Sequence, residues 1–206
     1  ETTLSVDGYK EAATLENFPL LVRISSARIS GFSYDILQND GKDIQFTSED
    51  GKTTYPHEID EWNTGDGEES LVWVRVPLSA GLKLKMKFGD TSMEEPPVYS
   101  TDGTVWKNSD YFAVYHLGET ADIGTTSFRA ADSTEHNISL KPVISGGTCE
   151  TMSSQTGIVG RGVRNLAADS TEKTSLKGES SYSAFGSATV FTVSGWVKTL
   201  KQVNGT

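Results

Sequence analysis

The sequence predicts an all-β protein made of antiparallel β-sandwiches of the jelly-roll type, arranged as two units. In several short segments, apolar and polar residues alternate with the period of two that a half-buried strand requires. Turn signals rich in Gly, Asp and Asn separate these segments, and the chain of 206 residues holds 20 glycines. No segment shows the apolar spacing of an amphipathic helix of normal length.

The stretch from 58 to 88 shows this alternation most clearly. In residues 82–88 (LKLKMKF), every second side chain is apolar and lysines stand between them. In residues 70–77 (SLVWVRVP), valines alternate with Leu71, Trp73 and Arg75. Both segments predict strands with one buried face, and the short turn between them predicts a β-hairpin.

Three segments that precede this stretch also predict β-structure. Residues 1–10 indicate an edge strand that ends in a turn, and residues 18–24 (FPLLVRI) indicate a buried strand. Strong turn signals at 39–41 (NDG) and 50–51 (DG) enclose a short alternating segment at 43–47. We therefore expect a second hairpin in this region.

The acidic, proline-containing segment that follows residue 90 divides the predicted units. Two glutamates precede two prolines there, which is typical of a stiff, extended linker, and we assign residues 91–103 to it. The first unit then covers residues 1–90 and the second covers residues 104–206. Within the second unit, residues 111–117 (YFAVYHL) and 190–197 (VFTVSGWV) predict strands.

Composition narrows the classes of partner. The net charge of −10 and the pI of about 4.8 argue against nucleic acid and against an anionic membrane surface. No apolar run reaches the length of a membrane span. The chain begins at Glu1 rather than Met, which indicates a processed or trimmed product, and Cys149 stands alone, so no internal disulfide is expected.

Five motifs in the first unit, in this order, resemble the bacterial DUF2341 family: NFPLLVRI, DIQFTSEDGKT, HEIDEWN, SLVWVRVP and LKLKMKFGD. The resemblance covers roughly residues 1–90. Members of that family occur in secreted or envelope-associated multidomain proteins, and the function of the family is undefined. The resemblance therefore implies a bacterial protein that is secreted or lies at the cell surface or cell envelope.

Four motifs in the second unit resemble the opening half of a laminin-G-like, concanavalin A-like lectin domain: VWKNSDYFAVYHLGE, ADSTEHN, GIVGRGV and FTVSGWVKT. The resemblance implies a jelly-roll sandwich that binds carbohydrate or protein, with calcium as a cofactor. Asp132 and Asn137 match the DS-x-x-x-N loop and are the calcium ligands it implies, although the same residues are also typical of a polar loop. A complete domain of that kind is longer than residues 104–206. We therefore expect the remainder of the polypeptide, or another chain, to complete the sandwich.

The sequence EID at residues 58–60 is the strongest candidate for a catalytic site. On a regular strand, Glu58, Asp60 and Trp62 share one face, and Ile59 and Glu61 share the other. This motif resembles the catalytic strand of jelly-roll glucanases of glycoside hydrolase family 16. Because the third position on this face is a tryptophan instead of a carboxylate, we favour a solvated acidic strand and assign no catalytic residue.

The same face suits the binding of sugars better than their cleavage. An exposed indole at Trp62 or Trp106 would stack on a sugar ring, while the two carboxylates would accept hydrogen bonds from its hydroxyls. The competing interpretation of each tryptophan is a place in the core, which we favour for Trp73 and Trp196 because they lie within apolar segments.

These observations favour a non-catalytic extracellular binding module within a larger secreted or cell-surface protein, with a glycan or an extracellular protein as its partner. The alternative is a structural adhesin or fibre subunit whose sandwich is completed by another chain. A glycoside hydrolase has less support. His57, His116 and His136 show no zinc-binding spacing, and the nucleophile elbow of serine hydrolases does not occur.

Overall fold

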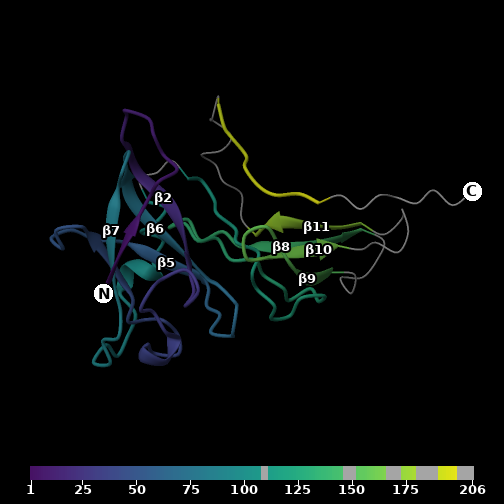
Figure 1. The fold of residues 1–206 in the computed structure, drawn as a ribbon. Coiled ribbons are helices and arrows are strands. Elements are labelled where there is room, and N and C mark those ends of the chain that lie inside the picture. Colours follow the sequence, from purple (N-terminus) through teal and green to yellow (C-terminus); the bar gives the residue numbers. More distant parts are fainter. Residues whose placement is uncertain (108–110, 146–151, 166–172, 180–189, 199–206) are drawn as a thin grey trace, which may run out of the picture.

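The computed structural model describes residues 1–107, 111–145, 152–165, 173–179 and 190–198, and this part of the chain is all-β (Figure 1). The strands pair antiparallel throughout, and the only helical elements among the described residues are two short 3-10 turns. The elements in chain order are β1 (Thr2–Ser5), β2 (Leu15–Ile24), η1 (Tyr34–Ile36), β3 (Gln45–Ser48), β4 (Thr54–Tyr55), β5 (His57–Glu61), β6 (Ser70–Leu78), β7 (Lys83–Lys87), η2 (Val98–Ser100), β8 (Leu140–Ser145), β9 (Met152–Thr156), β10 (Arg161–Asn165) and β11 (Lys173–Gly178).

Strands β1 to β7 form a sandwich of two antiparallel sheets. One sheet has the order β1-β7-β3-β4, and the other has the order β2-β6-β5. Side chains from both sheets meet in one core, in which Phe46, Val72, Val74, Leu84 and Met86 are all 0% exposed. Burial of each such side chain contributes about 1.5–3 kcal/mol to folding, so this core is the main source of stability in the described sandwich.

The hairpin predicted for residues 70–88 does not form, although both of its strands do. β6 pairs with β2 and β5, whereas β7 pairs with β1 and β3 in the opposite sheet. The chain crosses between the sheets at a turn in which the Leu82 amide donates to the Ser79 carbonyl and Gly81 has a φ of +73°. This crossing turns the apolar faces of β6 and β7 toward each other, which closes the core from both sides.

The predictions for the N-terminal segments agree with the structure. β1 is an edge strand, and β3 and β4 form the hairpin expected around the second turn signal. The segment 18–24 lies within the longer strand β2. Pro19 sits inside this strand opposite Arg75, and β2 tolerates it because an edge strand has backbone N–H groups that need no partner in the sheet.

The C-terminal part contains two antiparallel pairs, β8 with β11 and β9 with β10 (Figure 1). Phe128, Ala130 and Met152 form a small buried cluster beside them. The strand predicted at 111–117 is wrong, because its backbone pairs with a loop instead of a sheet. The Val114 amide donates to Asp132 Oδ1, and the Val114 carbonyl accepts from the Ser133 amide.

The strand predicted at 190–197 is also wrong: the segment pairs with no strand in the described part of the chain. Its apolar side chains face solvent, with Val193 84% and Trp196 76% exposed. The core position expected for Trp196 is therefore not observed. Cys149 lies outside the described residues.

The segment predicted as a linker, residues 91–103, packs along the sandwich. Gln38 Nε2 donates to the Met93 carbonyl at 2.7 Å, and Lys42 Nζ donates to the Glu94 carbonyl at 2.9 Å. The ring of Tyr99, in η2, contacts His57 with centroids 5.4 Å apart. The segment thus carries the chain along the first sandwich toward the outer face of β5 and β6.

Two glycines with nearly the same backbone conformation allow a test of how closely Trp62 packs in the sandwich. Gly41 and Gly51 have φ values of +70° and +75°, but only at Gly41 would a Cβ meet a neighbour, the Trp62 ring, at 2.7 Å. We expect Gly51→Ala to lower the free energy of unfolding by about 1–2 kcal/mol, the cost of a left-handed residue with a side chain. Gly41→Ala should lower it by about 1–3 kcal/mol more, because the ring must move. Urea denaturation measures both, and equal losses would contradict the close contact with Trp62.

Candidate functional site

A cluster of carboxylates, tryptophans and one histidine lies on the outer face of β5 and β6. Glu58 and Asp60 come from β5, Trp73 from β6, and Trp106 and His116 from the chain beyond the sandwich. His116 Nε2 lies 3.4 Å from Glu58 Oε1, and His116 Nδ1 lies 3.3 Å from Asp60 Oδ2. The first distance is that of an ion pair, since His116 Nε2 makes no hydrogen bond. One imidazole thus bridges the two carboxylates that the sequence singled out.

Both carboxylates also accept hydrogen bonds from other side chains. Trp106 Nε1 donates to Glu58 Oε2 at 2.5 Å, and Ser133 Oγ donates to Glu58 Oε1 at 2.7 Å. Trp73 Nε1 donates to Asp60 Oδ2 at 3.1 Å. The side chains of Glu58 and Asp60 are only 18% and 6% exposed, so protein groups take the place of water around them.

The environment of His116 favours its charged form. Burial alone would lower the pKa of this histidine, but the adjacent Glu58 carboxylate and the charges of Asp60 and Glu119 outweigh burial and raise the pKa above its usual value of 6.5. The imidazole also stacks on Trp73, with centroids 6.0 Å apart and planes inclined by 20°. An aromatic face adds to the stabilisation of a cation.

Trp106 does not offer the sugar-stacking surface that the sequence predicted. Its side chain is buried, with 4% exposed, and its ring packs on Trp73, Tyr111 and His116 at centroid distances of 5.3 to 5.7 Å. Its indole N–H is already bound to Glu58. Trp106 therefore joins the chain beyond the sandwich to β5, and its ring is covered.

A β-bulge in β5 separates Trp62 from Glu58 and Asp60. Ile59 pairs with Val72 and Glu61 pairs with Leu71, so Asp60 is an extra residue in the ladder. The bulge reverses the alternation, and Trp62 packs in the sandwich core, with its ring 5.4 Å from that of Tyr34. The predicted shared face of Glu58, Asp60 and Trp62 is therefore not observed.

Glu61 changes sides for the same reason. The sequence places it on the face opposite to Asp60, yet both carboxylates approach the same glycine. A Cβ on Gly160 would lie 3.3 Å from Glu61 Oε2 and 3.8 Å from Asp60 Oδ1. The bulge thus adds a carboxylate to the outer face of β5.

Asp132, the predicted calcium ligand, organises its own loop. Its Oδ1 accepts from the amides of Val114 and Thr134, and its Oδ2 accepts from Thr134 Oγ1 and the Ile138 amide, at 3.0 to 3.2 Å. Asn137 is exposed and has a left-handed φ of 51°, which the turn requires. The described residues contain no group of three or more His, Cys, Asp or Glu that could hold a metal ion. Since Asp132 is satisfied by protein donors, these residues do not fit a calcium ion here, and calcium rests on the resemblance alone.

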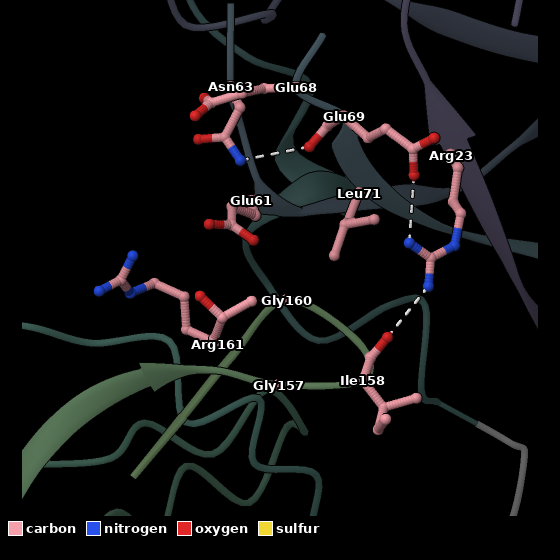
Figure 2. A pocket seen from close by; sticks show the side chains of 11 residues that line it. Arg23, Glu61, Asn63, Glu68, Glu69, Leu71, Gly157, Ile158, Gly160 and Arg161 are labelled. Atoms are coloured by element: carbon pink, nitrogen blue, oxygen red, sulfur yellow. Dashed lines mark hydrogen bonds and ion pairs between the residues drawn. The ribbon is translucent and has the colours of Figure 1, made fainter. Parts of the chain in front are cut away.

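An open pocket of about 350 Å³ lies beside the cluster, where the sandwich meets the turn between β9 and β10 (Figure 2). Strands β2, β5 and β6 and the β5–β6 loop line one side, and residues 156–161 line the other. Its lining consists of Arg23, Glu61, Asn63, Glu68, Glu69, Leu71, Thr156, Gly157, Ile158, Gly160 and Arg161.

Hydrogen bonds fix one wall of the pocket and connect it to the opposite turn. Arg23 Nη1 donates to Glu69 Oε2 at 3.2 Å, and Arg23 Nη2 donates to the Ile158 carbonyl at 3.2 Å (Figure 2). Asn63 Nδ2 donates to the Glu69 carbonyl, also at 3.2 Å. Across the pocket, Arg161 is held by a bond from its Nε to Ser154 Oγ at 2.8 Å. The pocket therefore presents fixed donors and acceptors on both walls.

Sequence reasoning did not identify His116 or the pocket. His116 carries no local motif, and only the three-dimensional structure brings it to Glu58 and Asp60. The pocket joins residues from four separate segments, of which only the glycine-rich turn GIVGR carries a local sequence signal. A bulge would have been needed to place Glu61 correctly.

His57, next to Glu58 but on the inner face of β5, has a pKa that is shifted in the opposite direction to that of His116. It is 1% exposed, its Nδ1 makes no hydrogen bond in the described structure, and burial lowers its pKa from 6.5 to about 4. His57 is thus neutral in the folded protein at pH values at which it would be protonated in the unfolded chain.

This difference predicts an acid-sensitive fold. Between pH 6.5 and about 4, the unfolded state binds a proton at His57 that the folded state does not, so stability falls as the pH falls. The total loss should be about 3 kcal/mol, at about 1.36 kcal/mol for each pKa unit. Urea denaturation across this range should show the loss in the wild type and a smaller one in His57→Leu. An unchanged pH slope in His57→Leu would contradict this role.

The described part of the chain contains no helix long and apolar enough to cross a membrane. No curated protein and no solved structure matches the chain. Residues 40–115 match the model of a family described as "Domain of unknown function (DUF2341)". The match supports the resemblance to DUF2341. It extends beyond residue 90, through residues 91–103, and ends at Tyr115, just before His116. No comparison supports the laminin-G-like resemblance. Over residues 40–115, from β3 to the segment that follows Trp106, the chain is therefore similar to the DUF2341 family.

Proposed function

We propose that the chain is a non-catalytic binding module for glycans within a larger secreted or cell-surface protein, and that the pocket between the sandwich and the β9–β10 turn is its site. The observation that supports this proposal most is the pocket itself, an open space of about 350 Å³ with polar side chains on two walls. Its volume is of the size that one or two sugar rings occupy, within the usual range for small-ligand sites.

The lining suits hydroxyl groups, which both donate and accept hydrogen bonds. Glu61 and Glu68 supply acceptors, and the guanidinium of Arg161 supplies donors. Leu71 and Ile158 add apolar surface, and Ile158 is 65% exposed at the pocket edge. This surface can contact the C–H groups of a sugar in place of the aromatic platform expected from the sequence.

The charges of the lining favour an uncharged ligand. Arg23 and Arg161 oppose three glutamates, and Glu69 is also paired with Arg28 just outside the pocket. The near balance gives no strong attraction for a polyanion or a polycation. Neutral glycans therefore fit better than charged ones.

A glycoside hydrolase has less support than a binding module. Hydrolysis needs two carboxyl groups on either side of the scissile bond, with room for a sugar between them. Glu58 and Asp60 are instead held together by His116 and covered by Trp73 and Trp106. The proposal therefore assigns them a structural role.

Substitutions in the pocket test the proposal. Glu61→Gln and Arg161→Gln should each weaken binding to a neutral polysaccharide about tenfold, because each removes a charge-assisted hydrogen bond of about 1.5–3 kcal/mol. Affinity electrophoresis through gels that contain neutral polysaccharides gives the dissociation constants. Lys177→Gln, an exposed change on β11, serves as the matched control and should bind like the wild type.

Two results would count against this assignment. If no neutral polysaccharide slows the wild-type protein, glycan binding fails. If binding occurs but Glu61→Gln and Arg161→Gln leave it unchanged, the site lies elsewhere.

The second candidate is a structural subunit whose sandwich is completed by another chain. Its support is the segment 190–197, in which Val190, Val193 and Val197 are 84 to 89% exposed and Trp196 is 76% exposed. The segment is rich in residues with high β-propensity, and it carries large apolar side chains on both alternating faces, Val190 and Trp196 on one and Phe191, Val193 and Val197 on the other. Such a surface is stabilised when a partner sheet covers it.

This candidate predicts assembly that depends on the segment. Light scattering coupled to size exclusion should give a particle heavier than one chain, and Val193→Asp should weaken the assembly about tenfold or more because it buries a charge. Val193→Ile keeps the apolar character and should assemble like the wild type. A single-chain mass at all concentrations, or assembly that Val193→Asp does not affect, would contradict this candidate.

A further inference from the structure

We propose that His116 is an electrostatic clamp: in its protonated form it holds residues 104–107 and 111–137 against the outer face of β5 and β6, and it thereby sets the shape of the pocket. Loss of the proton should loosen this segment and weaken ligand binding. The part of the inference that concerns ligand affinity rests on the proposed function, whereas the docking of the segment does not.

The docked segment is attached to the sandwich mainly through polar contacts that converge on Glu58. Trp106 and Ser133 donate to its two oxygens, and His116 lies against Oε1. A second anchor comes from Arg75 on β6, whose Nη1 donates to the carbonyls of Thr104 at 2.7 Å and Lys107 at 2.9 Å. His116 is the member of this set that can change its charge near neutral pH.

Carboxylates surround His116, and the aromatic side chains that pack on it are neutral. Glu58 and Asp60 reach it from β5, and Glu119 lies on its own segment, where Oε1 accepts from the Ala131 amide at 2.7 Å and Oε2 is buried without a hydrogen bond. Trp73 from β6 and Trp106 enclose the imidazole. If the imidazole becomes neutral, Glu58 and Asp60 are left as adjacent, largely buried charges without their shared cation, and this arrangement is unfavourable.

The clamp is connected to the pocket through adjacent residues of β5. Asp60 pairs with His116, and Glu61, the next residue, lines the pocket. Both carboxylates approach Gly160 in the β9–β10 turn, and Arg23 reaches the Ile158 carbonyl of the same turn. Because the pocket lies between this turn and the sandwich, its width depends on how firmly the C-terminal part is docked.

The direction of the pH effect follows from the pKa of His116. Because that pKa is raised in the folded protein, the stabilising contribution is fully present below the unfolded value of 6.5 and is lost as the pH rises through the folded value. The loss therefore occurs on the alkaline side, whereas His57 destabilises the fold on the acid side.

The test measures docking and binding separately on the full chain. Hydrogen exchange of the Trp106 indole N–H, which donates to Glu58 Oε2 on β5, reports docking once it is corrected for the intrinsic pH dependence of exchange. In the wild type, we expect protection to decrease by about tenfold for each unit by which the pKa of His116 is raised, as the pH increases from 6 to 9. His116→Gln should lack the pH-dependent protection, and His136→Gln, a change of an exposed histidine on the same segment, should keep it.

A rescue variant separates charge from packing. In the His116→Gln background, Asp60→Asn removes one of the two uncompensated carboxylates and should restore part of the protection at every pH. No restoration, together with protection in the wild type that is independent of pH, would overturn the clamp. If His116→Gln does not fold, the pH profiles of the wild type and His136→Gln decide the question alone.

Polysaccharide affinity, measured at pH 6 and pH 9, completes the experiment. A clamp that controls the pocket predicts weaker binding at pH 9 in the wild type and in His136→Gln. Protection that changes with pH in a protein that binds no polysaccharide would support the clamp and reject the glycan ligand. Binding and protection that are both constant with pH would reject the clamp and leave the glycan ligand standing.

Discussion

The burial of both faces of β6 is the constraint on which the rest of the structure depends. Its inner valines form the centre of the sandwich core, with Val72 and Val74 fully buried. Its outer face carries Trp73 and Arg75, and the segment that begins at Thr104 covers both: the Trp106 ring packs on Trp73, and Arg75 donates to the Thr104 carbonyl. One strand thus connects the stability of the sandwich to the docking of the chain beyond it, and the polar cluster lies at this junction.

Local alternation in the sequence was sufficient to predict β3, β6 and β7 and the all-β class, because the period of two is a direct result of strand geometry. It was not sufficient to predict how the strands pair. The same pattern in β6 and β7 is compatible with one hairpin or with two opposed sheets, and only the shared core selects the second arrangement. Likewise, the apolar alternation at 190–197 has the composition of a strand but finds no partner strand among the described residues.

Three residues of the polar cluster could be predicted from the sequence, but their roles could not. Glu58, Asp60 and Trp106 do meet, yet in a buried network in which both carboxylates accept hydrogen bonds from protein side chains, so the network attaches the later chain to β5. Trp62 was misplaced because a bulge cannot be recognised from residue types alone. His116 was missed because its significance depends on two carboxylates that lie far away in the sequence, and a lone histidine has no signature of its own.

The bulge at Asp60 makes the length of β5 more important than its composition. Between His57 and Trp62, both of which face the core, the chain needs four intervening residues instead of the odd number that a regular strand would supply. Deletion of a single residue there would turn Trp62 outward or draw a carboxylate into the core, whereas many substitutions would preserve the count. In evolution or in engineering, this strand should therefore accept changes of side chain much more readily than insertions or deletions.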